Sequence, residues 1–131
     1  MEARWFLPMD GVLMIPRALV VQSCPEVAAA VAASLAEAGW QAIVTADGCS
    51  AVTEIETWAP DVVLVDLTLP ALDGWYVLAA VGALPERPLL AVRVADAAEA
   101  DRAIALGADA WVDGDVHVVS AAGRLVPSLA A

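Results

Sequence analysis

Short apolar runs that alternate with segments of helical periodicity are the feature that most constrains the fold of this chain. The clearest run is Val-Val-Leu-Val at residues 62–65, which is rich in β-branched side chains and bounded by aspartates. Further strands are predicted at residues 18–21, 42–45, 89–92 and 110–112. Strands that are apolar on both faces are typical of a parallel sheet covered on both sides by helices, so the sequence predicts an α/β fold.

Turn and capping signals delimit four helices between these strands. Pro25 is suited to a first helical turn, and Asp96 with Glu99 three residues later forms the pattern of a capping box. The four helices are predicted from Pro25 to near Gly39, over residues 50–58, over residues 74–81, and from the N-cap Asp96 to a left-handed C-cap at Gly107.

The two ends of the chain carry weaker patterns. A length of 131 residues favours one domain, which we place at residues 17–131. Residues 1–16 are apolar without a clean period and are predicted to form an N-terminal arm that covers the domain or exchanges within a dimer. The tail after Asp115 is interrupted by Gly123 and Pro127, so the domain is expected to end in an irregular or shortened fifth helix.

Charge and cysteine content argue against several classes of function. The chain has 17 acidic and 6 basic residues, a formal net charge of -11 and no lysine, which argues against binding to nucleic acid or to an anionic membrane. Two cysteines and one histidine do not indicate a disulfide scaffold or a zinc site. No signal peptide or membrane span is recognised, so we expect a soluble cytoplasmic protein.

A motif follows the predicted strand at residues 62–65. Asp66 ends the strand, Pro70 lies in the next loop, and Asp73-Gly74 precedes a helix. With residues 107–111, this pattern resembles the receiver domain of two-component response regulators, the CheY-like family, over about residues 18–115. The resemblance implies a flavodoxin-like fold, with a five-stranded parallel sheet in the order 2-1-3-4-5.

The resemblance also implies a chemistry, which is transfer of a phosphoryl group from a kinase histidine to an aspartate. The acceptor corresponds to Asp66, and a metal-binding backbone carbonyl corresponds to that of Thr68. In the family, Mg²⁺ and a lysine neutralise charge on the transferred group.

The remaining positions of that site depart from the family's pattern. The acidic pair that holds Mg²⁺ corresponds to Gln22 and Ser23, the hydroxyl residue to Arg93, and the lysine to Gly114. Neutral side chains beside an arginine make a poor magnesium site, so we expect no cofactor and no catalytic residue. Asp66 is interpreted as a vestigial acceptor in a degenerate receiver, or pseudo-receiver.

Several side chains keep two interpretations at this stage. Arg93 either pairs with Asp66 and fixes the pocket in one state, or points to solvent. Gln22 and Ser23 either satisfy backbone groups of their loop or coordinate a ligand. Cys24 is either inert or a redox-sensitive thiol, and a stable bridge between Cys24 and Cys49 is not expected in a reducing cytosol.

The predicted function is therefore a phosphorylation-independent protein-interaction module in signal transduction, not an enzyme. The alternative is a functional receiver that accepts a phosphoryl group on Asp66 from a histidine kinase. A ligand-binding or redox protein on the same fold is disfavoured, because residues 22–26 contain no glycine-rich phosphate loop.

No second domain follows in the sequence, so output is expected through another signalling protein or a second copy of the chain. In the family the usual contact face comprises helix four, strand five and helix five. That face here includes Ala110, Trp111 and Val112. Three aspartates around strand five are predicted to put negative charge where the family carries its lysine: Asp109, Asp113 and Asp115.

Overall fold

Strands and helices alternate along the part of the chain that the structure describes. The computed structural model describes residues 15–68 and 73–112. In chain order the elements are β1 (Arg17–Val21), α1 (Pro25–Glu37), β2 (Gln41–Thr45), α2 (Gly48–Trp58), β3 (Val62–Asp66), α3 (Gly74–Gly82), β4 (Leu89–Arg93), α4 (Ala97–Ala105) and β5 (Ala110–Val112). The five strands and four helices predicted within these residues are confirmed with bounds within about two residues, an ordinary uncertainty for element ends. The N-terminal arm and the tail after Asp115 lie outside the described residues.

The caps predicted for α4 are present, with one difference. The Asp96 side chain accepts a hydrogen bond from the Glu99 N–H at 2.9 Å. The Glu99 carboxylate accepts from the N–H of Ala95 at 2.9 Å, one residue earlier than in the usual capping box. Gly107 follows the helix with a φ of 113°, the left-handed conformation expected there.

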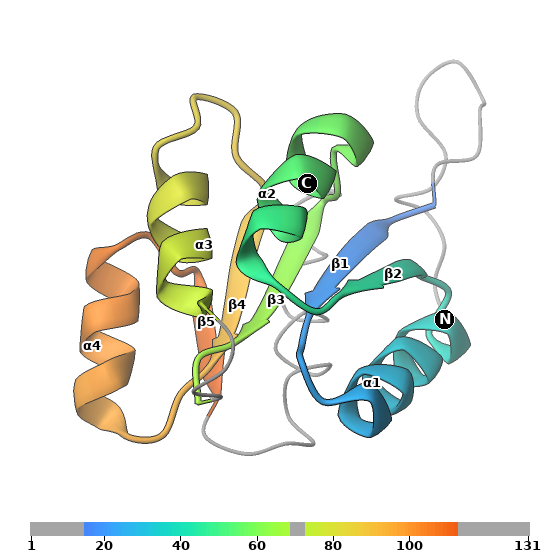
Figure 1. Ribbon diagram of the computed structural model, residues 1–131, viewed down its shortest axis with the longest axis horizontal. Helices are drawn as coiled ribbons and strands as arrows, with labels where there is room; N and C mark the ends of the chain where they lie inside the picture. Colours follow the sequence, from blue (N-terminus) through green and yellow to red (C-terminus); the bar gives the residue numbers. More distant parts are fainter. Residues whose placement is uncertain (1–14, 69–72, 113–131) are drawn as a thin grey trace.

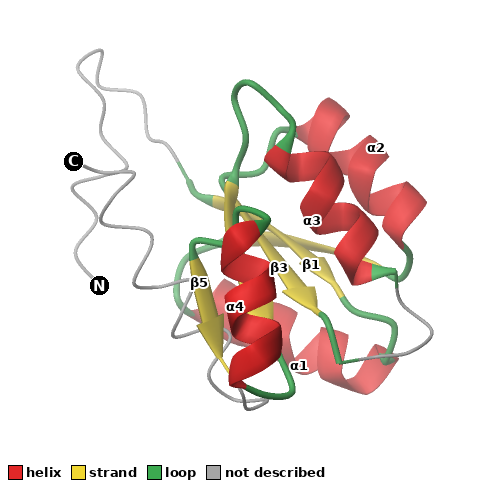
Figure 2. Ribbon diagram, turned by 90° about the vertical axis from the view of Figure 1, so that its left-hand side faces the viewer, coloured by secondary structure: helices red, strands yellow, loops and turns green. Residues whose placement is uncertain are grey.

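The five strands form one parallel sheet in the order β2-β1-β3-β4-β5, as predicted. Figure 1 shows the helices on both sides of this sheet, and Figure 2 shows α1 on the face opposite to α2, α3 and α4. In the described part of the chain, no helix is long and apolar enough to cross a bilayer.

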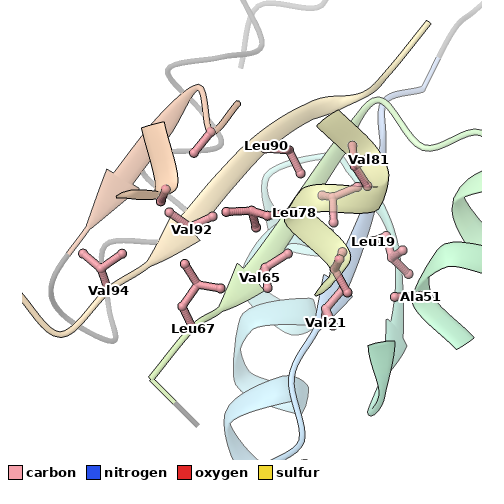
Figure 3. Packing of buried hydrophobic residues seen from close by; sticks show 14 of the residues in the cluster. Leu19, Val21, Ala51, Val65, Leu67, Leu78, Val81, Leu90, Val92 and Val94 are labelled. Atoms are coloured by element: carbon pink, nitrogen blue, oxygen red, sulfur yellow. The ribbon is translucent and has the colours of Figure 1, made fainter. Parts of the chain in front are cut away.

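The core has two layers because successive side chains of a strand point to opposite faces. In β3, Val63 and Val65 pack under α2 and α3, whereas Val62 and Leu64 pack on the other face with Leu35 of α1. Figure 3 shows the larger layer, in which strand side chains such as Val65 and Val92 meet Leu78 and Val81 of α3. β3 is buried along its whole length, which holds the residue at its end in a fixed position.

Ala59, after the end of α2, has a left-handed backbone with φ 53° and ψ 61°. An L-residue in this conformation is strained by about 1 kcal/mol, and glycine is not. We expect Ala59→Gly to raise the free energy of unfolding by about 0.5 kcal/mol in urea titrations, since added chain entropy in the unfolded state offsets part of the gain. Ala83 after α3 has φ -86°, so the matched Ala83→Gly change should lower stability. Equal losses in both variants would contradict this explanation.

Candidate functional site

The register of the sheet brings three polar residues together at the carboxyl ends of adjacent strands. Asp66 at the end of β3 is the direct partner of Arg93 at the end of β4. Val21 of β1 pairs with Val65 of β3, so Gln22, the next residue, lies level with Asp66. Parallel strands end at the same edge of a sheet, which is where sites form in open α/β folds.

Asp66 is 4% exposed, and donors surround both of its carboxylate oxygens. Oδ2 accepts hydrogen bonds from Nη1 of Arg93 at 2.7 Å and from Nε2 of Gln22 at 3.0 Å. Oδ1 accepts from the backbone N–H of Thr68 at 2.9 Å and from its hydroxyl at 2.6 Å. A carboxylate offers about four lone-pair sites. The four hydrogen bonds therefore saturate Asp66.

Arg93 completes the hydrogen-bond network around Asp66. Its Nη1 atom forms the ion pair with Asp66 and also donates to the Thr68 hydroxyl oxygen at 3.0 Å. The Arg93 side chain is 24% exposed, so most of it lies within the pocket. The interpretation in which Arg93 points away to solvent is wrong, and the one in which it pairs with Asp66 describes the structure.

The pocket favours the ionised form of Asp66. Burial by itself raises the pKa of this carboxyl, but the hydrogen bonds from Thr68, Gln22 and Arg93 outweigh it and hold the pKa below its usual value. Asp66 is therefore a carboxylate at neutral pH, with its charge compensated by Arg93.

Gln22 connects the pocket to the loop after β1. Its side chain donates to Asp66 through Nε2, and its Oε1 accepts from the backbone N–H of Cys24 at 3.1 Å. This satisfies a loop backbone group, as one of the two interpretations expected. Ser23 is half-buried in the same loop and makes no hydrogen bond to Asp66.

The two cysteines are free thiols. Cys24 is half-buried and lies 3.4 Å from the Glu26 carboxylate, measured from Sγ to Oε2, whereas Cys49 is exposed at the start of α2. The two cysteines thus lie at the starts of different helices, α1 and α2.

The magnesium ion that the family pattern implies does not fit the described residues of this pocket. A hard cation needs free oxygen ligands. Here the N–H groups of Arg93 and Gln22 point at one oxygen of Asp66, and Thr68 occupies the other. Within the described ranges, no three acidic, histidine or cysteine side chains are placed to hold a metal.

The position of Asp109 corrects one expectation. Asp109 precedes β5 and lies at the opposite edge of the sheet from Asp66, where its carboxylate accepts from the Leu90 N–H at 2.8 Å. It also forms an ion pair with Arg87, with 2.9 Å between Nη1 and Oδ2. Strand β5 separates it from the pocket, so Asp109 adds no negative charge beside Asp66. Asp113, Asp115 and Gly114 lie outside the described residues.

The three residues expected on an interaction face differ in exposure. The Trp111 side chain is 39% exposed, Ala110 is half-buried, and Val112 is 7% exposed and packs in the core with Ala91. The alternation of side chains along β5 explains this pattern. Of the three, Trp111 offers the largest surface to a partner.

The hydroxyl of Thr68 is the pocket contact that the sequence analysis missed. The resemblance assigned a role only to its backbone carbonyl, whereas the side chain donates to Asp66 and accepts from Arg93. The turn chemistry of aspartate signals only the backbone contact, because an aspartate commonly accepts a hydrogen bond from the backbone N–H two positions later.

Comparison with known proteins finds relatives that are named as sensory transduction or transcriptional regulatory proteins. The sensory transduction protein RegX3 of Mycolicibacterium smegmatis is 35% identical over 96 residues, which are 72% of this chain and 42% of that protein. The transcriptional regulatory protein PrrA of Mycobacterium tuberculosis is 30% identical over 102 residues, 78% of this chain and 44% of that protein. The chain thus spans less than half the length of these relatives.

Solved structures agree with the sequence relatives. A response regulator signal receiver domain from Bermanella marisrubri has a TM-score of 0.74 and 27% identity, covering 88% of this chain and 98% of that one. A response regulator from Chloroflexus aurantiacus, described as putative, has a TM-score of 0.77 at 21% identity, covering 89% and 99%. The latter likeness supports the fold alone.

The family itself follows from the match over most of the chain. The sequence model of the response regulator receiver domain matches residues 18–117, which include every strand and helix described above except Arg17, the first residue of β1. Receiver domains are signalling modules of two-component systems and interact with other signalling proteins such as kinases. The chain belongs to the response regulator receiver domain family.

Proposed function

We propose that this receiver domain works without phosphoryl transfer, as a protein-interaction module whose pocket is held in one state by Arg93. The observation that carries the proposal is the saturation of the Asp66 carboxylate by four hydrogen bonds, two of them on each oxygen. In this proposal the module acts in the cytoplasm and needs no Mg²⁺.

The chemistry of phosphoryl transfer supports this assignment. Attack on phosphorus requires a carboxylate oxygen with a free lone pair, together with positive charge placed on the transferred group. In this pocket Arg93 neutralises the carboxylate itself at a distance of 2.7 Å. An incoming phosphoryl group would first have to break that ion pair.

A surface formed by α4 and the edge strand β5 supports an interaction role. Large apolar side chains are exposed on and after α4 and on β5: Ile104 by 50%, Leu106 by 41% and Trp111 by 39%. Figure 2 shows α4 beside β5, and exposed apolar residues on neighbouring elements are typical of protein contacts. We propose that another signalling protein or a second copy of the chain binds there.

Intact-mass measurement with a small phosphodonor tests the proposal. After incubation with acetyl phosphate and Mg²⁺, we expect the wild-type mass to be unchanged, as for Asp66→Ala. A receiver domain that carries the complete acidic pair, hydroxyl and lysine serves as the positive control for the donor.

A restored pocket sharpens the same experiment. The combined changes Gln22→Asp, Ser23→Asp, Arg93→Thr and Gly114→Lys return the residues of the family's pattern, so this variant is expected to gain the mass of one phosphoryl group. Adding Asp66→Ala should abolish that gain. A phosphoryl adduct on the wild type that disappears in Asp66→Ala would instead identify a functional receiver.

A further inference from the structure

A groove of about 680 Å³ lies at the edge of the sheet opposite to Asp66. One wall is the end of α2 with the loop into β3, and the other is the loop between α3 and β4. Figure 1 shows these two segments side by side, where β3 and β4 begin. Its volume falls within the range of about 300 to 1,000 Å³ found for ligand sites in proteins.

The inner surface of the groove is apolar and stiff. Ile55 is 5% exposed and Pro60 is buried, while Leu84 and Leu89 are half-buried on the other side. Three of the lining residues are prolines: Pro60, Pro85 and Pro88. Because proline fixes φ, these walls lose little entropy when a partner binds.

The rim of the groove is acidic. Glu56 and Glu86 are exposed there, and their carboxylates form no ion pair with any described residue. Asp61 adds a third carboxylate, one oxygen of which accepts from the Arg17 N–H.

The one arginine on the rim does not neutralise these groups. Nη1 and Nη2 of Arg87 donate to Asp109 at 2.9 and 3.2 Å, and Nη1 also donates to the Pro88 carbonyl oxygen. The Asp109 hydrogen bonds raise the pKa of Arg87, so the Arg87 guanidinium stays charged and engaged with Asp109. The rim therefore presents uncompensated negative charge around an apolar floor.

We propose that this groove binds a basic peptide segment of a protein partner, one in which arginine or lysine side chains flank an aliphatic residue. The aliphatic side chain packs against Ile55 and Leu84, and the cations face Glu56 and Glu86. The groove uses none of the residues of the Asp66 pocket, so the site does not depend on whether Asp66 accepts a phosphoryl group.

Titration of the ¹⁵N-labelled chain with a defined peptide tests this site. The probe is acetyl-Arg-Leu-Arg-Leu-Arg-amide at low ionic strength, where surface charges are weakly screened. We expect ¹H–¹⁵N shift changes to centre on Ile55, Ala59, Leu84 and Leu89. The Glu56→Gln/Glu86→Gln variant is expected to bind about fivefold more weakly, equivalent to about 1 kcal/mol.

Three controls separate the groove from general attraction to an acidic chain. The matched variant Glu37→Gln/Asp101→Asn removes the same charge from exposed positions on α1 and α4 and should change affinity less than about twofold. The peptide with glutamate in place of arginine should not bind. The peptide with glycine in place of leucine should bind much more weakly, because it lacks the apolar contact.

The opposite results would overturn the proposal. Equal weakening in the two double variants would mean that net charge alone attracts the peptide. Equal binding of the glycine-containing peptide would mean that the apolar floor takes no part. Shift changes away from the groove, or no binding by the first peptide, would mean that no basic segment binds in the groove.

Discussion

Replacing Arg93 with methionine is expected to lower the free energy of unfolding by about 3 kcal/mol at pH 7. The change keeps much of the apolar stem but leaves the Asp66 carboxylate, which is 4% exposed, without its cation. It also removes the donor to the Thr68 hydroxyl oxygen. Urea denaturation followed by circular dichroism measures the loss, provided that the slope with denaturant stays the same.

The free energy of unfolding lost in Arg93→Met should depend on pH, and the ion pair determines the direction of that dependence. The native pKa of Asp66 lies below its ordinary value of 3.8, so the carboxylate stabilises the folded chain above about pH 4. That contribution is lost as the pH falls through the lower native pKa. The stability difference between wild type and Arg93→Met should therefore shrink in acid.

Two comparisons show whether the pair itself is responsible. A double-mutant cycle built from Arg93→Met, Asp66→Asn and the variant with both changes should give a coupling energy of about 2 kcal/mol. Arg87→Met breaks the pair with Asp109, whose side chains are 29% and 24% exposed, and should cost only about 1 kcal/mol. A pH-independent loss below about 1 kcal/mol for Arg93→Met would contradict a buried ion pair.

The hydrogen bonds around Asp66 also give this aspartate a role in the fold itself. In this structure the carboxylate at the end of β3 ties the loop after β1 to the end of β4 through Gln22 and Arg93. Asp66 thus has a structural role that needs neither a metal nor a phosphoryl group. A pocket of this kind holds its loops in one arrangement, as the proposed function requires.

The fold could be predicted from the sequence because local and global signals agree. The apolar run at residues 62–65 becomes a strand buried on both faces, and Pro25 and Asp96 mark where helices begin. The Asp66–Arg93 contact was one of two alternatives, since the direction of a long side chain depends on strand register.

The prediction that Asp109 adds negative charge near Asp66 was wrong for a different reason. It is close in sequence to Asp113, but a three-residue strand, β5, lies between them. Residues before and after a strand lie at opposite edges of a sheet, so the position of Asp109 followed from the predicted strand itself. The groove was not predictable in the same way, because its walls come from two loops whose prolines individually signal only turns.

Replacing Gly82 with alanine is expected to lower the free energy of unfolding by about 2 kcal/mol, although alanine is the better helix former. Gly82 ends α3 where the helix meets the residue after α4. A Cβ atom at this position would lie 2.7 Å from the carbonyl oxygen of Leu106. That oxygen belongs to the backbone, so no rotamer change relieves the contact and the ends of α3 and α4 must move apart.

The sign of the change makes the Gly82→Ala test decisive. Helix propensity alone would stabilise this variant by up to about 1 kcal/mol, whereas the contact with Leu106 destabilises it. Ala79 is exposed on the same helix, and Ala79→Gly should lose about 1 kcal/mol from propensity without any steric change. Thermal or urea unfolding of the two variants gives the comparison. A more stable Gly82→Ala would mean that α3 and α4 do not approach this closely, because only their contact opposes the gain in propensity.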